Sequence, residues 1–257
     1  MCIVFLDFKN VPHLPLILAA NRDEFFERPA LPMHFWEDYP SLLAGKDLMG
    51  GGTWLGMTRK GRLAVITNYR ELTPNAHASS RGGLVTDFLL GRGSIADFQK
   101  RLEEEGRSFN GFNLLFGTVN ELHYYSNQIG HSTTLEPGVY GLSNHLLDTP
   151  WPKVELGKGL LHELPHQDTW GKDALFGLLT NTSIPPDHLL PQTGVELAYE
   201  RTLGSIFVTG TKYGTRCSTV IKMDDNLDVS VQERTYTNGP DQFESRSFRF
   251  FLDSDLG

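Results

Sequence analysis

The residue that most suggests chemistry is Cys2, which directly follows Met1. Methionine aminopeptidases generally remove Met1 when the second residue is small, which would leave Cys2 at the terminus. A terminal cysteine carries a thiol with a pKa of about 8.5 and an α-amine with a pKa of roughly 7.7–8. The amine can take the thiol proton directly or through a water, so one residue supplies both nucleophile and base. The alternative is that Cys2 is a small buried residue that opens a strand.

A polar run follows the apolar residues 14–20 and reads Asn21-Arg22-Asp23-Glu24. We predict that residues 16–20 form a strand paired with the one that begins beside Cys2, which places the polar run close to the thiol. A guanidinium there would lower the thiol pKa and stabilise developing charge, and a carboxylate would position the α-ammonium. The alternative is a solvated turn with a surface ion pair.

Three more polar residues lie at the ends of predicted strands. Asn68 ends one strand and Asn144 follows another. An amide N–H at such a point can donate to an oxyanion, although asparagine also simply favours turns. Arg216 begins a strand after a glycine turn and is a candidate for the same cleft. We interpret its neighbour Cys217 as a packed strand residue.

Other ligand chemistries find little support in the sequence. The formal net charge is −8 and no basic stripe carries interleaved aromatics, which argues against nucleic acid as the main partner. The two cysteines are too few for a structural zinc site, and Gly50-Gly51-Gly52 lacks the Gly-Lys-Ser/Thr order of a P-loop. We therefore predict no metal and no cofactor required for catalysis.

The N-terminus has neither a basic region nor a small-residue cleavage site, and Asp7 interrupts its apolar run. This pattern predicts no secretory signal and no transit peptide. The apolar run at residues 14–20 is too short to span a bilayer, and two cysteines fit a reducing compartment. We expect a cytoplasmic protein without a membrane-spanning segment.

Groups of strands alternate with groups of helices along the 257 residues, without a linker or an internal repeat. This order favours antiparallel sheets with helices stacked on them, in a single domain spanning residues 1–257. The strands are predicted at residues 3–8, 16–20, 53–58, 63–67, 112–118, 121–126, 139–142, 205–209, 217–223 and 227–233. The helices are predicted at residues 83–90, 95–105 with Ser94 as N-cap, 151–164 and 172–179.

A set of motifs extends over nearly the whole chain. They are Cys2 and residues 18–24, 51–56, 67–69, 110–114, 140–144, 149–151 and 213–216. In this combination the sequence resembles the Transport and Golgi organisation protein 2 family, also called the NRDE family. The resemblance implies an α+β fold, a four-layer αββα N-terminal-nucleophile hydrolase-like sandwich of two antiparallel sheets.

The sequence is also similar to the bile-salt hydrolase and penicillin acylase group, which begins Met-Cys and cleaves linear amides. There the terminal cysteine attacks, an arginine and an aspartate of the next strand assist, asparagines form the oxyanion site and a late arginine completes the pocket. Because the order of the polar run differs, the choices between Asn21 and Arg22 and between Asp23 and Glu24 stay open. The resemblance assigns these roles to Cys2, Arg22, Asp23, Asn68, Asn144 and Arg216.

Two functions follow from this resemblance. The first is an N-terminal cysteine amidohydrolase or acyltransferase that acts on a linear amide or acyl bond. Family links to secretory-pathway organisation, mitochondrial and lipid metabolism and haem trafficking give the second, a non-catalytic carrier or chaperone for haem or an acyl lipid. Haem would then be cargo, and mitochondria or the Golgi would be the alternative location in a eukaryote. The sequence makes no prediction of the oligomeric state.

Overall fold

The computed structural model describes residues 2–75, 77–164 and 172–253. The strands in these ranges form two antiparallel sheets, with helices packed on them, so the predicted α+β class is confirmed. The chain divides into two compact units. The first comprises residues 1–27, 137–143 and 147–250, and the second comprises residues 28–136, 144–146 and 251–257. Neither unit is a contiguous segment, because the chain passes between them repeatedly.

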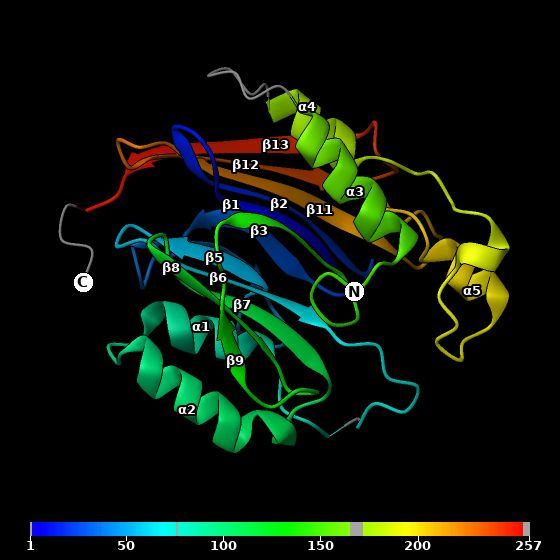
Figure 1. The fold of residues 1–257 in the computed structure, drawn as a ribbon, viewed down its shortest axis with the longest axis horizontal. Coiled ribbons are helices and arrows are strands. Elements are labelled where there is room, and N and C mark those ends of the chain that lie inside the picture. The colour runs from blue at the N-terminus through cyan, green and yellow to red at the C-terminus, as the bar shows by residue number, and fades with distance from the viewer. Residues whose placement is uncertain (1, 76, 165–171, 254–257) are drawn as a thin grey trace. The chain divides into compact units, whose positions relative to one another are not determined.

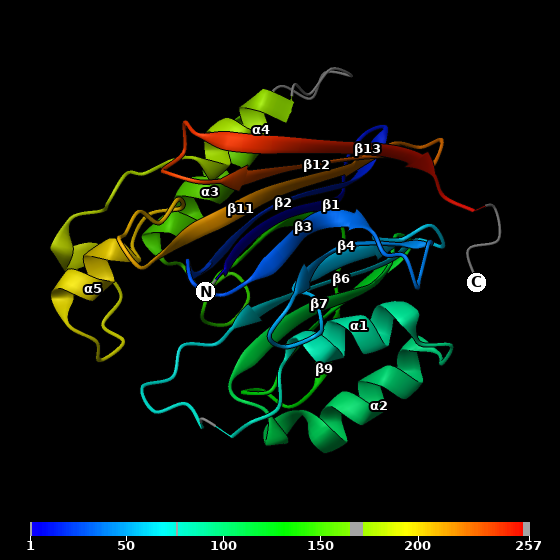
Figure 2. The same ribbon diagram turned by 180° about the vertical axis from the view of Figure 1, so that it is seen from behind.

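The first unit contains a six-stranded sheet with the strand order β10-β1-β2-β11-β12-β13. β1, which begins with Cys2, and β2, which contains the polar run 21–24, are neighbours in the interior of this sheet. Figure 2 shows β13 at the free edge. The strands are β1 (Cys2–Val11), β2 (Leu14–Phe25), β10 (Gly138–Leu142), β11 (Tyr213–Met223), β12 (Asp228–Tyr236) and β13 (Phe243–Phe251).

Helices α3 (Pro152–Glu163) and α4 (Lys172–Leu179) cover one face of this sheet (Figure 1). Leu161 of α3 and Phe176 of α4 join a buried cluster with Phe5 and Ile17 from the sheet. Because side chains alternate along a strand, every second residue of β1 and β2 faces these helices. A short 3-10 helix (Asp187–Leu189) and α5 (Leu197–Thr202) follow before the chain enters β11.

The second unit contains a seven-stranded sheet with the strand order β3 to β9, in which every strand pairs with its neighbour in sequence. This meander needs only short connections, except where two helices separate β6 from β7. The elements are β3 (Ala30–Phe35), β4 (Leu42–Asp47), β5 (Leu55–Thr58), β6 (Arg62–Asn68), α1 (Gly82–Leu90), α2 (Ile95–Glu105), a 3-10 helix (Gly106–Ser108), β7 (Phe112–Thr118), β8 (Glu121–Ser126) and β9 (Ser132–Thr134).

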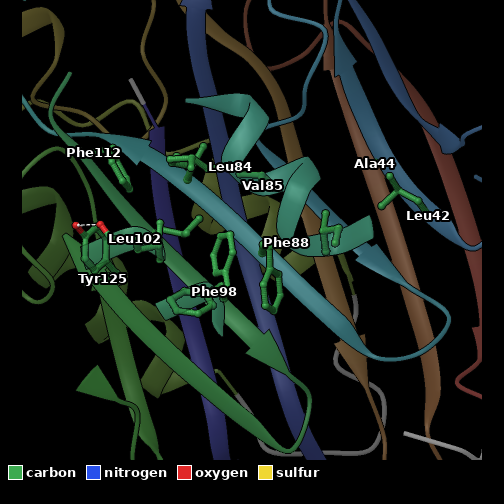
Figure 3. Packing of buried hydrophobic residues seen from close by; sticks show 14 of the residues in the cluster. Leu42, Ala44, Leu84, Val85, Phe88, Phe98, Leu102, Phe112 and Tyr125 are labelled. Carbon is green, nitrogen blue, oxygen red and sulfur yellow. Dashed lines mark hydrogen bonds between the residues drawn. The ribbon is translucent and has the colours of Figure 1, made fainter. Parts of the chain in front are cut away.

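Aromatic side chains join the helices of the second unit to its sheet (Figure 3). Phe88 of α1 and Phe98 of α2 lie with their ring centroids 5.0 Å apart, and both contact Phe116 of β7. Tyr125 of β8 is fully buried and donates its hydroxyl to the Leu102 carbonyl at 2.7 Å. This cluster fills the space between the helices and one face of the sheet.

One predicted strand, at residues 205–209, is wrong. The segment 203–208 is buried, but no neighbouring strand forms a ladder with it. Its backbone instead bonds to separate partners: the Phe207 N–H donates to the Asn181 carbonyl at 2.8 Å and the Val208 N–H to the Thr215 hydroxyl at 2.9 Å. An apolar run indicates burial, and here burial occurs without a strand.

Candidate active site

Cys2, Arg22 and Cys217 form a row across three strands. Cys2 lies opposite Arg22 in the β1–β2 pair, and Arg22 lies opposite Cys217 in the β2–β11 pair. Directly opposite residues share a sheet face, so the three side chains lie on one face. The next residue of β1, Ile3, packs in the helix-covered cluster, so this row lies on the other face. The side chain of Cys2 is half-buried.

The Cys2 thiol lies between groups with opposite effects on its acidity. Burial raises its pKa above the ordinary value, and the negative charge of Asp23 raises it further. The positive charge of Arg22 lowers it, as does the backbone N–H of Asp23, which donates to the sulfur. The net pKa is raised, so the thiol is protonated at neutral pH and needs a base before it can attack.

Asp23 is almost completely buried, with 2% of its surface exposed. Its Oδ1 accepts a hydrogen bond of 2.7 Å from the Thr215 hydroxyl, whose oxygen in turn accepts from the Val208 N–H. Burial raises the pKa of Asp23, whereas the N-terminal ammonium, the positive charge of Lys153 and the Thr215 hydrogen bond lower it. These groups give the carboxylate one fixed orientation at the end of β2.

The structure distinguishes the residues that the sequence left open. Asn21 is turned toward the helix-covered face, where its amide donates to the Leu179 carbonyl at 2.8 Å and to the Ile206 carbonyl at 3.0 Å. Arg22, not Asn21, is therefore the residue beside Cys2. Asp23 is the carboxylate whose charge and N–H act on Cys2, whereas Glu24 lies 4.0 Å from the Arg22 guanidinium.

Arg216 is brought to the same end of the sheet by a β-bulge. The β2–β11 register skips between Thr215 and Cys217, so Arg216 has no opposite residue. Its Nη1 donates to the Phe25 carbonyl at 2.8 Å. Burial lowers the pKa of Arg216, and the charge of Arg22 lowers it further. The two guanidinium groups are thus close enough to interact.

Asn68 and Asn144 both belong to the second unit and are joined to each other. The Asn144 amide donates to the Asn68 carbonyl at 2.9 Å, and the Arg70 N–H donates to the Asn144 carbonyl at 2.8 Å. The side chain of Asn144 is fully buried. The structure thus links these two asparagines by a hydrogen bond, and their role as oxyanion donors to Cys2 stays a prediction.

Lys153 has no role in the sequence-based prediction, although its positive charge acts on Asp23. Lys153 is 5% exposed and its Nζ donates to the Leu203 carbonyl at 2.9 Å. A signal was present in the sequence: Lys153 shares the spacing i, i+4, i+8 with Gly157 and Leu161, the buried stripe of α3. A lysine in such a stripe is unusual, because burying an ammonium is costly.

Tyr213 is a second neighbour without a predicted role. Its hydroxyl donates to the Asp23 carbonyl at 3.0 Å. Burial raises the pKa of Tyr213 well above the ordinary value, and the charges of Asp23 and Cys2 add to this effect. The tyrosine therefore contributes a neutral hydroxyl to the end of the site.

The described residues contain neither a cluster of metal ligands nor a membrane-spanning helix. Residues 162–166 read His-Glu-Leu-Pro-His, which has the histidine spacing of a helical zinc motif. However, α3 ends at Glu163, and a proline between the two histidines is unfavourable in a helix. Residues 165–171 lie outside the described ranges. Within those ranges, no group of three or more acidic, histidine or cysteine side chains could hold a metal. No described helix is long and apolar enough to cross a bilayer.

The fold and site define an α+β protein of two antiparallel sheets, with a cysteine, an arginine and an aspartate at paired strand ends. A family model described as Transport and Golgi organisation 2 matches residues 1–238, so the chain belongs to this family, as its motifs predict.

Known relatives agree with this identification. The chain is 36% identical over 276 residues to the Transport and Golgi organization protein 2 homolog of Bos taurus, covering 99% of this chain and 100% of that protein. It is 35% identical over 276 residues to the Homo sapiens homolog, with the same coverage of 99% and 100%. Among solved structures it is similar to the Caenorhabditis elegans N-acylethanolamine-hydrolyzing acid amidase ortholog, with a TM-score of 0.49 and 9% identity over 86% of this chain and 92% of that chain.

Proposed function

We propose that this protein is an N-terminal cysteine hydrolase that cleaves a linear amide or acyl bond. The observation that carries the proposal is the strand register that sets Cys2 opposite Arg22 and directs the Asp23 N–H to its sulfur. The proposal requires removal of Met1, a residue that lies outside the described ranges.

The reaction would begin with proton transfer from the Cys2 thiol to its own α-amine, because the raised thiol pKa calls for a base. The sulfur attacks the acyl carbon, the carbon–nitrogen bond breaks and the leaving amine takes the proton from the α-ammonium. Water then attacks the thioester, which releases the acid and restores the thiol. A second amine in place of water would make the reaction an acyl transfer.

In this proposal the surrounding residues stabilise charge. The Asp23 carboxylate holds the α-ammonium of Cys2, and Arg22 with Arg216 stabilises the negative charge that develops during attack. The amides of Asn68 and Asn144 take the role of oxyanion donors that the family resemblance implies.

An electrophilic amide probe tests the proposal directly. The protein is purified from its native host, its intact mass is measured, and the probe-labelled peptide is identified by mass spectrometry. We expect loss of Met1 and acylation at Cys2, and we expect Cys2→Ala to abolish labelling. Alanine is small enough for Met1 removal to continue, so the variant changes the sulfur alone.

Cys217→Ala is the matched control. Cys217 also lies opposite Arg22, but burial and Glu233 raise its pKa well above the ordinary value. Its loss should leave labelling at Cys2 unchanged. Equal labelling of Cys2→Ala and wild type, or retention of Met1 in the native protein, would contradict the hydrolase. Absence of acylation together with saturable, Cys2-independent haem binding would support the carrier that the sequence offers as the alternative.

A further inference from the structure

We propose that Lys153 is a positioning residue of this site, whose buried ammonium keeps Asp23 in the charged form that holds the α-ammonium of Cys2. This inference rests on the proposed function and adds a residue to it. Three features carry it: the burial of Lys153, its place on the helix that covers β1, and the fixed geometry of Asp23.

Packing alone gives no reason for a lysine at position 153. The buried stripe of α3 lies against the sheet so closely that a Cβ on Gly157 would collide with the Phe5 ring. A leucine or methionine at position 153 would fill such a site without the cost of burying an ammonium.

Asp23 lies on the same face of the sheet as this stripe. It follows Ile17 and Ala19 at two-residue intervals along β2, and both belong to the cluster beneath α3 and α4. The buried segment 203–208 contacts both charged residues. At one end, the Leu203 carbonyl accepts a hydrogen bond from the Lys153 ammonium. At the other end, the Val208 N–H donates to the Thr215 hydroxyl, which in turn donates to the Asp23 carboxylate. Lysine and aspartate are therefore fixed by one buried piece of backbone.

Two positive charges oppose the effect of burial on Asp23, first the N-terminal ammonium and then Lys153. Burial raises the pKa of Asp23, and Lys153 is the basic side chain that opposes this effect most strongly. Among the other groups that act on the carboxylate, the N-terminal ammonium lowers its pKa more than Lys153 does, the Thr215 hydroxyl lowers it by donating a hydrogen bond, and the adjacent Glu24 carboxylate raises it. The Cys2 thiol and the Tyr213 hydroxyl also interact electrostatically with Asp23. Without Lys153 the carboxyl would be protonated more readily and could no longer attract an ammonium.

Lys153→Met tests this role with two measurements. The first is the titration of the Asp23 carboxyl by carbon-13 NMR, assigned by comparison with Asp23→Asn. We expect its pKa to rise by about one pH unit or more, the usual effect of losing a close opposite charge. The second is the pH profile of probe acylation at Cys2, whose acid limb should move to higher pH, with a rate at neutral pH about tenfold lower.

Three controls separate positioning from general stability. Lys153→Arg keeps the charge and should restore both readouts. Lys158→Met removes a different lysine of α3, which forms an ion pair with Asp148 at 2.7 Å, and should change neither. In an Asp23→Asn background, Lys153→Met should slow acylation no further, because the two residues act as one unit.

An unchanged Asp23 titration in folded Lys153→Met would overturn the inference, as would additive losses in the double variant. If Lys153→Met does not fold, Lys153→Gln replaces it, because its amide can still donate to the Leu203 carbonyl. The NMR titration needs no turnover. A wild-type protein that is never acylated would therefore refute the hydrolase, while the coupling of Lys153 to Asp23 would still be decided.

Discussion

Besides burial and the N-terminal ammonium, two side chains of opposite charge act on the pKa of the Cys2 thiol, so their removal should shift it in opposite directions. Asp23 raises the thiol pKa and Arg22 lowers it. Asp23→Asn should therefore shift the pH midpoint of alkylation at Cys2 downward, and Arg22→Met should shift it upward, each by about one pH unit. The measurement is the rate of iodoacetamide alkylation from pH 6 to about 10, in a Cys217→Ser background that leaves one thiol.

Lys172→Met is the control for these shifts, since Lys172 on α4 does not appear among the groups that act on Cys2. Lys172→Met should leave the pH midpoint of alkylation unchanged. If Asp23→Asn and Arg22→Met shifted this midpoint in the same direction, a change in structure and not in charge would control the thiol.

The candidate residues near Cys2 could be predicted because they are local in sequence. A polar run after an apolar strand, a short turn and a cysteine at the start bring Cys2 close to this run in an antiparallel hairpin, but only the observed register selects Arg22 over Asn21. Lys153 could not be found in this way. Its charge acts on Asp23 because α3 packs on the sheet. The periodicity of a helix does not predict which strand its buried stripe will cover.

Most elements could also be predicted, and the exceptions have physical reasons. β7, β8, α2 and α4 match their predicted bounds, and Ser94 is the N-cap of α2 as predicted, in a capping box with Asp97 that was not predicted. β13 was not predicted because most of its side chains are exposed, which leaves no alternation to detect. β3, β4, β9 and α5 were missed as well, since short or proline-containing segments carry little periodic signal.

The packing of α3 on β1 gives a prediction about two glycines of one helix. A Cβ on Gly157 would meet the Phe5 ring, whereas a Cβ on Gly159 would meet nothing within 4 Å. Gly157→Ala should therefore destabilise the protein by about 1–3 kcal/mol through overpacking. Gly159→Ala should stabilise it by about 0.5–1 kcal/mol, because alanine favours helix more than glycine does. Urea unfolding of both variants measures the difference, and equal effects would contradict this packing.

Across the whole molecule, one compact unit contains a buried carboxylate and the other a partly buried one, and their pKa values are shifted in opposite directions. In the first unit, burial holds the pKa of Asp23 above its ordinary value. In the second, burial acts the same way on Asp47, but hydrogen bonds from Arg28 and from the Gly50 and Met49 N–H groups outweigh it and hold the pKa below the ordinary value. The pH dependence of stability should therefore distinguish a functional carboxylate from a structural one.

For Asp23 the folded state binds the proton more tightly than the unfolded chain, so ionisation costs stability as pH rises from about 4 through the folded pKa. Asp23→Asn should raise Tm at neutral pH, and the gain should vanish below pH about 4, where both states are protonated. Asp47→Asn should lower Tm at neutral pH, and its loss should vanish as pH falls through the depressed folded pKa. Thermal unfolding from pH 3 to 8 measures both, at roughly 2–4 °C per kcal/mol.

A rise in Tm for Asp23→Asn together with slower acylation would mean that the protein retains a carboxylate at the expense of stability, as expected where a site needs a charge that the fold disfavours. Thr215→Val is a further control, because it removes the hydroxyl that donates to Asp23 without removing the carboxylate. It should raise the pKa of Asp23 further and should not increase Tm at neutral pH. A lower Tm for Asp23→Asn at neutral pH would instead assign Asp23 a structural role and remove the main support for its contact with the α-ammonium.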